Sequence, residues 1–201
     1  MNYYNEKHID IPSEIIRSRV IYLDGEVNED LATAVCKQLL YLDNEDSEKP
    51  IQLFINSPGG SVLDGLAIIN TMNSIKAPVY TCVYGLAASM GAAILSCGEI
   101  GHRYAYPRSK VMVHRVSSGT QGNIQDMRVS LKFSEDLDAE LTEMIATNCG
   151  MRKADYEKAT ERDKWLNAKE ASEFGIIDEI LKNTDKEKKR AEALKERFKK
   201  K

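Results

Sequence analysis

Short apolar runs, each followed by a turn and a helical pattern, recur along the first half of this chain. Residues 20–23, 51–55 and 79–84 have the length and composition of strands, and turn-forming residues separate each from a stretch of helically spaced apolar side chains. Strands that alternate with crossover helices form a mostly parallel sheet with right-handed connections. The sequence therefore predicts an α/β fold built from repeated strand and helix units.

The longest predicted helix covers residues 123–148, which contain neither Gly nor Pro. Its apolar residues recur at spacings of three, four and six. At a rise of about 1.5 Å per residue, such a helix would be about 39 Å long. A domain of this size cannot cover so long a helix, so we expect part of its apolar stripe to contact another subunit. In the alternative, the helix lies flat on the sheet of its own chain.

Composition indicates a single globular domain followed by a charged tail. Hydrophobic residues make up 42% and charged residues 29% of the 201 positions, which suffices for one sizeable core. We place this domain at residues 1–181. Residues 182–201 carry ten Lys/Arg against four Asp/Glu, a pattern that favours a solvated helical tail over a surface for an acidic partner. We expect no nucleic-acid partner.

Redox and targeting signals point to the cytoplasm. The four cysteines form no Cys-x-x-Cys pair, and the first eight residues contain no apolar signal core. The longest nearly apolar run, residues 87–95, is far shorter than the stretch of about 20 residues that a membrane-spanning helix needs. We therefore expect a cytoplasmic protein with reduced cysteines and no membrane partner.

Three short motifs contain the residue types of a serine nucleophile system. Ser89 lies in GLAASMG, His114 ends VMVH, and Asp163 lies in ERDKW. A nucleophile, a base and an orienting carboxylate are the roles that acyl transfer by serine requires. The order Ser, His, Asp argues against the α/β-hydrolases, which have a Gly-x-Ser-x-Gly elbow and the order Ser, Asp/Glu, His, and against the chymotrypsin and subtilisin orders.

Each of these three residues also has a structural explanation. A lone His at the end of a buried strand is usually structural, small residues around Ser89 commonly allow close packing, and acidic residues are abundant around Asp163. Trp165 and the leucine after it suggest that the Asp163 segment turns back onto the core, which would bury its carboxylate in part. The other histidines, His8 and His102, lie in a polar N-terminus and a predicted turn and are weaker candidates for the base.

Two backbone amides are candidates for an oxyanion hole. Ser89 sits where a predicted strand meets a predicted helix, so the N–H of Met90 would point to the same region as the serine hydroxyl. Gly59 and Gly60 end another strand and open another helix, which supplies a second N–H that no Cβ hinders. Such donors stabilise the charge of a tetrahedral intermediate, and each can contribute about 100-fold in rate.

The chain closely resembles the ClpP serine peptidases in four segments. These are FINSPGG, AASMGA, VMVH and TERD, with separations of 25 residues from Ser89 to His114 and 49 from His114 to Asp163. The resemblance extends from about residue 10 to residue 181. It implies a ClpP/crotonase-like fold of repeated strand-strand-helix units, with a long protruding helix and a Gly-rich strand. It also implies a Ser89/His114/Asp163 triad that cleaves peptides and unfolded proteins.

The resemblance further implies a set of binding contacts and an assembly. The Gly60 and Met90 amides would form the oxyanion hole, and extended peptide would bind near Val62 and Ser117. Two stacked heptameric rings would enclose the sites, with the long helix and the Gly-rich segment at the contact between rings. Arg162 is then a candidate for pairing across that contact.

Several residues depart from the family pattern. The family usually begins with a longer N-terminal segment that docks the ATPase, whereas nine residues precede Asp10 here. Arg115 and Val116 follow the histidine where Gln-Pro is common, and Leu86 replaces a frequent Gln. Gln52 and Ser74 occupy positions that are often aromatic and help to form the ATPase-docking pocket. These departures concern pairing with the usual unfoldase, leave the triad untouched, and suggest a divergent or phage-type paralogue.

Cofactor motifs are absent from the sequence, and two other function classes are open. No Gly-x-x-x-x-Gly-Lys-Ser/Thr motif and no His-Glu-x-x-His or clustered Cys/His pattern occurs, so we expect no metal or cofactor in this chain and ATP use only through a separate AAA+ unfoldase. One alternative is a crotonase-like acyl-CoA enzyme, which holds a thioester enolate with paired amides. The other is a non-catalytic ring subunit of a Clp complex.

Overall fold

The computed structural model describes residues 11–181 and 189–190. The helices are α1 (Ile11–Arg17), α2 (Glu29–Glu45), α3 (Val62–Ser74), α4 (Met90–Ser96), α5 (Ile124–Asn148), α6 (Lys153–Ala159) and α7 (Ala168–Glu173). The strands are β1 (Val20–Asp24), β2 (Ile51–Ser57), β3 (Val79–Ala88), β4 (Arg103–Ala105), β5 (Lys110–Val113), β6 (Lys164–Asn167) and β7 (Glu179–Ile180). His8 and all of the predicted Lys-rich tail except residues 189–190 lie outside the described residues.

One mostly parallel sheet organises the described part of the chain. Its strand order is β1-β2-β3-β4-β7, and β5 pairs with both β3 and β6. Every strand pair is parallel except β5 with β6. The long strand β3 pairs with β4 through its first half and with β5 through its second half. The α/β fold predicted from the alternating pattern is confirmed.

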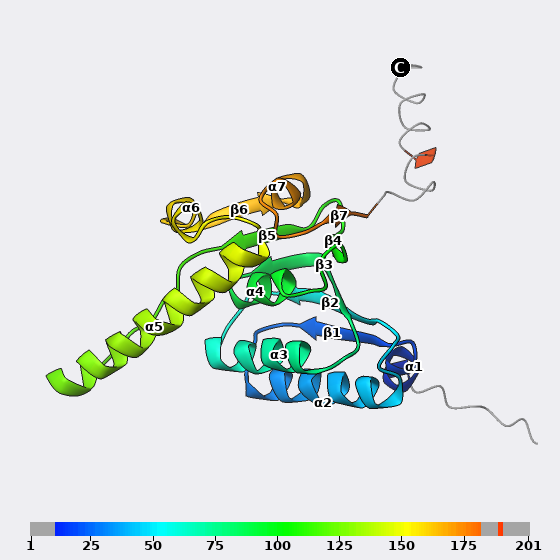
Figure 1. Ribbon diagram of the computed structural model, residues 1–201, viewed down its shortest axis with the longest axis horizontal. Helices are drawn as coiled ribbons and strands as arrows, with labels where there is room; N and C mark the ends of the chain where they lie inside the picture. Colours follow the sequence, from blue (N-terminus) through cyan, green and yellow to red (C-terminus); the bar gives the residue numbers. More distant parts are fainter. Residues whose placement is uncertain (1–10, 182–188, 191–201) are drawn as a thin grey trace, which may run out of the picture.

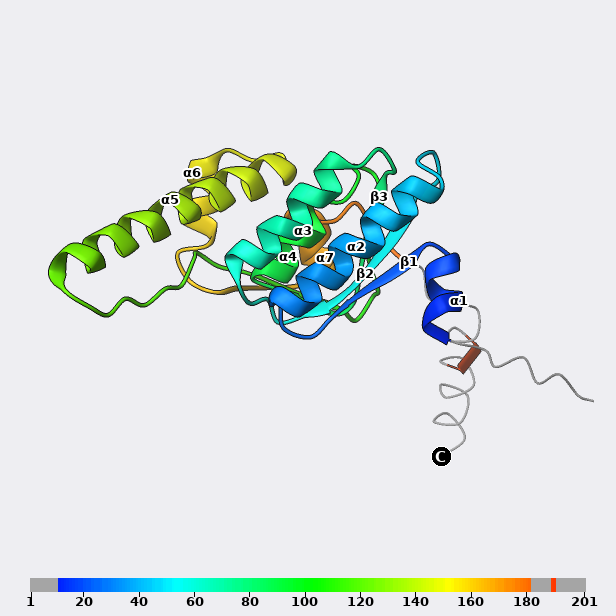
Figure 2. The ribbon, with the colours of Figure 1, turned by 90° about the horizontal axis from the view of Figure 1, so that it is seen from below.

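Helices α2 and α3 lie side by side against the sheet, as Figures 1 and 2 show from two directions. Asn28 caps the N-terminus of α2, because its side-chain oxygen accepts a hydrogen bond from the Leu31 N–H at 3.0 Å. Alternate residues of the strands point into the layer between sheet and helices. The fully buried residues of this layer include Ile21, Leu23, Leu39, Leu53, Ile55 and Ile68.

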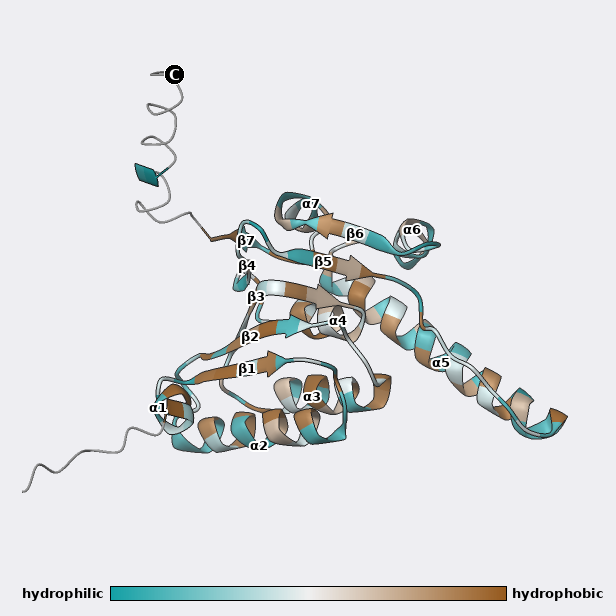
Figure 3. Ribbon diagram, turned by 180° about the vertical axis from the view of Figure 1, so that it is seen from behind, coloured by the Kyte–Doolittle hydropathy of each residue, from teal (hydrophilic) through white to brown (hydrophobic). Residues whose placement is uncertain are grey.

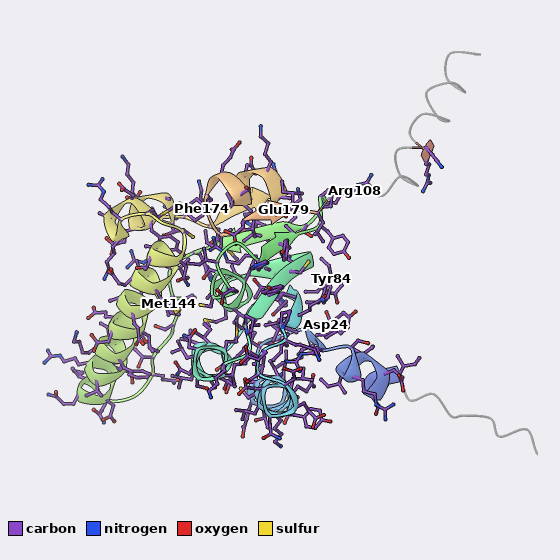
Figure 4. All side chains as sticks on the ribbon, turned by 45° about the vertical axis from the view of Figure 1, so that its right-hand side comes forward. Asp24, Tyr84, Arg108, Met144, Phe174 and Glu179 are labelled. Atoms are coloured by element: carbon purple, nitrogen blue, oxygen red, sulfur yellow. The ribbon has the colours of Figure 1, made fainter. Side chains whose placement is uncertain are left out.

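The opposite face of β1, β2 and β3 carries a cluster of aromatic side chains. Tyr22 stacks on Phe54 with ring centroids 5.5 Å apart, and Tyr84 meets both rings edge-on. The Tyr84 hydroxyl donates a hydrogen bond to Asp24, and Figure 4 shows the two side chains next to each other. Gln52, which stands at one of the positions expected to be aromatic, lies exposed on β2 close to this cluster. A polar side chain therefore lies beside the aromatic residues there.

Helix α5 projects from the body of the molecule (Figure 1). Asn123 caps it with hydrogen bonds from the N–H groups of Gln125 and Asp126, each 3.0 Å long. Buried residues occur only in its second half, the first of them being Leu141. Its projecting half exposes large apolar side chains, and Figure 3 shows hydrophobic residues recurring along it. These exposed residues are Ile124, Val129, Leu131 and Phe133. The alternative of a helix lying flat on its own sheet is wrong.

The Gly-rich segment at residues 117–122 forms no strand within the described chain. It leads from β5 to α5, and no described strand pairs with it. A strand needs a hydrogen-bonded neighbour, so the expected Gly-rich strand is not formed by this chain alone. Among the described residues no helix is both long and apolar enough to cross a membrane.

A nearly buried ion pair fixes β7 beside β4. Arg103 in β4 donates to the Asp178 carboxylate through Nε at 2.8 Å and through Nη2 at 2.5 Å, and its Nη1 donates to the Asn148 carbonyl at 2.8 Å. Burial alone raises the pKa of Asp178, but hydrogen bonds from the Arg103 side chain, the Arg103 N–H and the Gly101 N–H outweigh it and hold the pKa below its usual range. The pair therefore joins the end of α5 to the edge of the sheet.

Candidate active site

Ser89 lies in the sharp turn between β3 and α4. Its backbone has φ 53° and ψ −121°, a conformation that residues with a Cβ rarely adopt. The Ser89 N–H donates to the Met112 carbonyl at 2.9 Å, which ties the turn to β5. The small residues around it allow the close packing that this turn needs: a Cβ built on Gly59 would lie 2.6 Å from the Ser89 Cβ.

His114 follows β5 and lies beside Ser89. Because β5 pairs in parallel with the end of β3, with Ala88 opposite Met112, the residues that follow each strand emerge at the same edge of the sheet. The His114 Nε2 is 2.9 Å from the Ser89 Oγ. When the imidazole carries its proton on Nδ1, Nε2 accepts a hydrogen bond from the serine hydroxyl.

Asp163 approaches the other side of the same imidazole. It precedes β6, which runs antiparallel to β5 with Lys164 opposite Val113, and this register places Asp163 near His114. The Asp163 Oδ1 lies 3.5 Å from the His114 Nδ1, which is an ion-pair separation but longer than a good hydrogen bond.

The expected partial burial of the Asp163 carboxylate is wrong. The side chain of Asp163 is 63% exposed. Trp165 was expected to turn onto the core, but it is 57% exposed, whereas the neighbouring Leu166 is buried. In the short strand β6, consecutive side chains point to opposite faces of the sheet, so only one of the two neighbours can face the core.

The two candidate oxyanion amides meet at this turn. Gly60 has φ 149°, and the adjoining Ser61 N–H donates to the Val27 carbonyl at 2.8 Å, which holds the glycine turn against the loop after β1. The Gly60 and Met90 N–H groups make no hydrogen bond to any other described residue. Both residues line the cavity into which Ser89 opens. The arrangement therefore leaves two backbone donors available beside the serine.

A cavity of about 270 Å³ adjoins Ser89 and His114. Val62, at the start of α3, and Ser117, after β5, both line it, as the resemblance implies for peptide-binding residues. A shallower depression continues past His114 toward Arg162 and Asp163. All sequence-predicted site residues thus border one continuous surface.

An ion pair beside the site has no counterpart in the sequence-based prediction. Arg115 donates to the Asp138 carboxylate through Nε at 3.0 Å and also through Nη2, and Asp138 accepts the Val116 N–H at 2.9 Å. Burial by itself raises the pKa of Asp138, but these hydrogen bonds outweigh it and hold the pKa below its usual range. The pair ties the segment after His114 to α5. Arg115 stands out in the sequence, but Asp138 is one of many charges in a long helix.

Tyr156 in α6 was also missed. It lines the same cavity, and the described part of the chain offers no hydrogen-bond partner to its buried hydroxyl. No sequence signal marks this tyrosine. His102, by contrast, is remote from the cavity: it stacks on Tyr80 with centroids 3.9 Å apart, and its Nδ1 lies 2.9 Å from the Tyr104 hydroxyl.

Comparison with known protein families agrees with the fold and with the motifs. The model of the Clp protease family matches residues 4–184. That span includes every described strand and every residue of the candidate site. No group of three or more His, Cys, Asp and Glu side chains in the described residues is arranged to hold a metal ion.

Proposed function

The chain belongs to the Clp protease family, and we propose that it is a serine endopeptidase in which Ser89 is the nucleophile, His114 the general base and Asp163 the orienting carboxylate. The proposal rests chiefly on one observation, the 2.9 Å separation between His114 Nε2 and Ser89 Oγ. A serine hydroxyl is a weak nucleophile until a base removes its proton during attack. The observed separation is within the range that this proton transfer needs.

The first chemical step follows from these positions. Ser89 Oγ attacks the carbonyl carbon of the bound peptide while its proton passes to His114 Nε2. Asp163 stabilises the positive imidazolium through Nδ1. Because their present separation is 3.5 Å, a small side-chain rotation of the exposed Asp163 is needed to form a direct hydrogen bond.

The amides of Gly60 and Met90 would stabilise the oxyanion that develops during this attack. Both N–H groups are unpaired within the described chain and border the cavity next to Ser89. His114 then returns its proton to the leaving amine, and the peptide remains bound to Ser89 as an ester. A water molecule, deprotonated by His114, hydrolyses the ester and regenerates the serine.

We propose that the substrates are extended peptides and unfolded proteins held near Val62 and Ser117. We also propose two stacked heptameric rings that enclose the sites, since members of this family generally form ring oligomers. The apolar side chains exposed on the projecting half of α5 support a contact with another copy of the chain. Folded substrates would require a separate AAA+ unfoldase, and the chain itself would need no cofactor.

The remaining assignments follow from the same picture. The peptidase domain is residues 1–181, and Arg162 is available for pairing with another subunit because it lies exposed beside Asp163. The four cysteines are free thiols, which supports a reducing, cytoplasmic location. The contact between Ser89 and His114 favours a peptidase over a crotonase-like acyl-CoA enzyme or a non-catalytic ring subunit, because neither of these needs an activated serine.

Cleavage of a short fluorogenic peptide, measured together with particle mass, tests the proposal. We expect a ring-sized particle whose cleavage activity is lost in Ser89→Ala and His114→Ala. Ser172→Ala and His102→Ala are the matched controls, because both residues lie outside the cavity, and these variants should remain active. Cleavage that survives Ser89→Ala would refute the assignment. Digestion of intact folded proteins by a monomer would refute the enclosed compartment.

A further inference from the structure

Residues 115–122, which lead from β5 to α5, are held by hydrogen bonds to a single side chain. β5 ends at Val113, and no described strand pairs with the segment that follows. Arg115 and Val116 donate to the Asp138 carboxylate. Within the described part of the chain, no other hydrogen bond joins residues 115–122 to a residue outside the segment. An acidic side chain of α5 is thus the main polar anchor of the segment that follows the proposed catalytic histidine.

The geometry of this anchor is specific. Asp138 Oδ1 accepts the Val116 N–H at 2.9 Å and the Arg115 Nε–H at 3.0 Å, and Oδ2 also accepts from the Arg115 guanidinium. The side chain of Asp138 is only 19% exposed, so water screens the pair in part. A guanidinium that meets a carboxylate in this way forms strong and directional hydrogen bonds. Glu157 adds only a longer ion pair, with its Oε1 3.9 Å from Arg115 Nη1.

The anchor depends on the two residues by which the segment departs from the family pattern. Gln-Pro is common at this point in the family, and a proline has no N–H to donate. Here Arg115 supplies a charged donor and Val116 supplies a backbone donor, and both meet Asp138. The Val116 side chain also packs against the hydrophobic core. The three residues therefore form one unit, in which the carboxylate fixes the backbone where a proline ring would otherwise restrict it.

This unit lies on the substrate-binding side of the site. His114 directly follows β5, which its pairing with β3 and with β6 holds in place without help from Asp138. Ser117, by contrast, lies beyond the paired part of β5 and directly after Val116, and both of these residues line the cavity beside Ser89. A backbone that is mobile there must be ordered whenever a peptide binds, and that ordering lowers affinity.

We propose that Asp138 is a positioning residue for substrate binding, which holds the backbone of residues 115–117 from α5 in the conformation that binds the peptide. The inference rests on the proposed peptidase function. It gives α5 a role in substrate binding in addition to its proposed contact with another subunit. Asp138 acts through Arg115 and Val116, so it is not itself a catalytic residue.

The test measures peptide cleavage and serine reactivity of the assembled Asp138→Asn protein. The substitution keeps the shape of the side chain and removes its charge. We expect KM for a short fluorogenic peptide to rise about tenfold, with kcat within about twofold of the wild type. A small dialkyl fluorophosphonate has no peptide chain that could lie along Ser117, so it should label Ser89 at the wild-type rate within about twofold. An equal loss of cleavage and labelling would show a general effect on the triad and overturn the inference.

Asp155→Asn is the matched control. Asp155 pairs with Arg152 through two hydrogen bonds at the start of α6, its side chain is 51% exposed, and it does not line the cavity. The same substitution there should leave KM and the labelling rate unchanged. A similar rise of KM in this control would show that loss of any acidic charge nearby suffices, and it would overturn the specific role of Asp138.

A double-mutant cycle with Arg115→Gln tests whether Asp138 acts through Arg115. In the Arg115→Gln background, Asp138→Asn should raise KM about threefold or less, because the charged donor is already missing. A full tenfold rise in that background would overturn the inference. Arg115→Gln alone should also raise KM without slowing the labelling of Ser89, which keeps the test decisive even if Asp138→Asn does not assemble.

The remaining outcomes separate the inference from the function on which it rests. Ser89-dependent cleavage with the same KM in the wild type and in Asp138→Asn would overturn the inference and leave the peptidase function intact. Absence of both Ser89 labelling and Ser89-dependent cleavage in the assembled wild type would refute the peptidase function, and the inference with it.

Discussion

The backbone of Ser89 should be strained, and the strain predicts an unusual order of stability between two inactive variants. Ser89 has φ 53° and ψ −121°, a conformation that costs a residue with a Cβ about 1–3 kcal/mol. Glycine adopts such a conformation without that cost, but it gives the unfolded chain additional entropy worth about 0.5–1 kcal/mol. Ser89→Gly should therefore be more stable than Ser89→Ala by about 0.5–2 kcal/mol.

The comparison with alanine isolates the backbone. Both variants lose the hydroxyl and its contact with His114, so this loss cancels between them. Ala34 provides a matched control because it is exposed in the interior of α2. There the same exchange of Ala for Gly should destabilise the protein by about 1 kcal/mol. The two Ala-to-Gly exchanges are thus expected to have opposite signs.

Denaturant unfolding at one fixed protomer concentration measures both differences, since assembly makes stability depend on concentration. The m-values of the four proteins should agree, so that the midpoints report stability alone. If Ser89→Gly proves less stable than Ser89→Ala by an amount similar to the Ala34→Gly effect, the serine turn carries no strain. That result would refute the inference that the fold stores strain at Ser89.

Three further perturbations test the parts that hold the site. Asp178→Asn should destabilise the protein by about 3–5 kcal/mol, because Arg103 would stay buried without its counter-ion. Since the folded pKa of Asp178 is lowered, the stability that the ion pair contributes to the wild type is present above about pH 4 and is lost as the pH falls further. Unfolding curves of the variant that match those of the wild type at pH 7 would contradict this prediction. Asp138→Asn should lower kcat/KM for short peptides about tenfold and should also lower the unfolding midpoint, because Arg115 loses a charge-assisted partner and the lowered pKa of Asp138 means that its charged form stabilises the fold. Unchanged kinetics would show that the pair does not position the site. Gly59→Ala should remove activity, because the new Cβ would lie 2.6 Å from the Cβ of Ser89 and 3.0 Å from the backbone nitrogen of Met90. A fully active variant would show that the turn can move.

The sequence predicts the pairing of Ser89 with His114 because both residues follow strands of a parallel sheet. Parallel strands present their carboxyl ends at one edge, so the topology alone brings the two residues close. The register of β3 with β5 then fixes the distance. The residue pattern also predicts α5, because a long amphipathic stretch without Gly or Pro strongly favours a helix.

Features that depend on how distant elements pack could not be predicted in this way. The exposure of Asp163 depends on β6 lying at the edge of the sheet, and strands as short as β6 give no clear alternation. Asp138 and Tyr156 reach the cavity only because α5 and α6 pack against each other and against the segment after β5. No local sequence pattern around a charged residue in a long helix, or around a tyrosine in a short one, indicates such contacts. The same holds for residues 117–122, beside which no described strand lies, so the expected strand is not formed among the described residues.

Reaction of the assembled protein with a fluorophosphonate, followed by mass spectrometry, tests the activated serine most directly. We predict one adduct per chain on Ser89, no adduct in Ser89→Ala, and a reaction about 100-fold or more slower in His114→Ala, because the base would be missing. An adduct on another residue, or a Ser89 adduct that forms equally fast without His114, would contradict it.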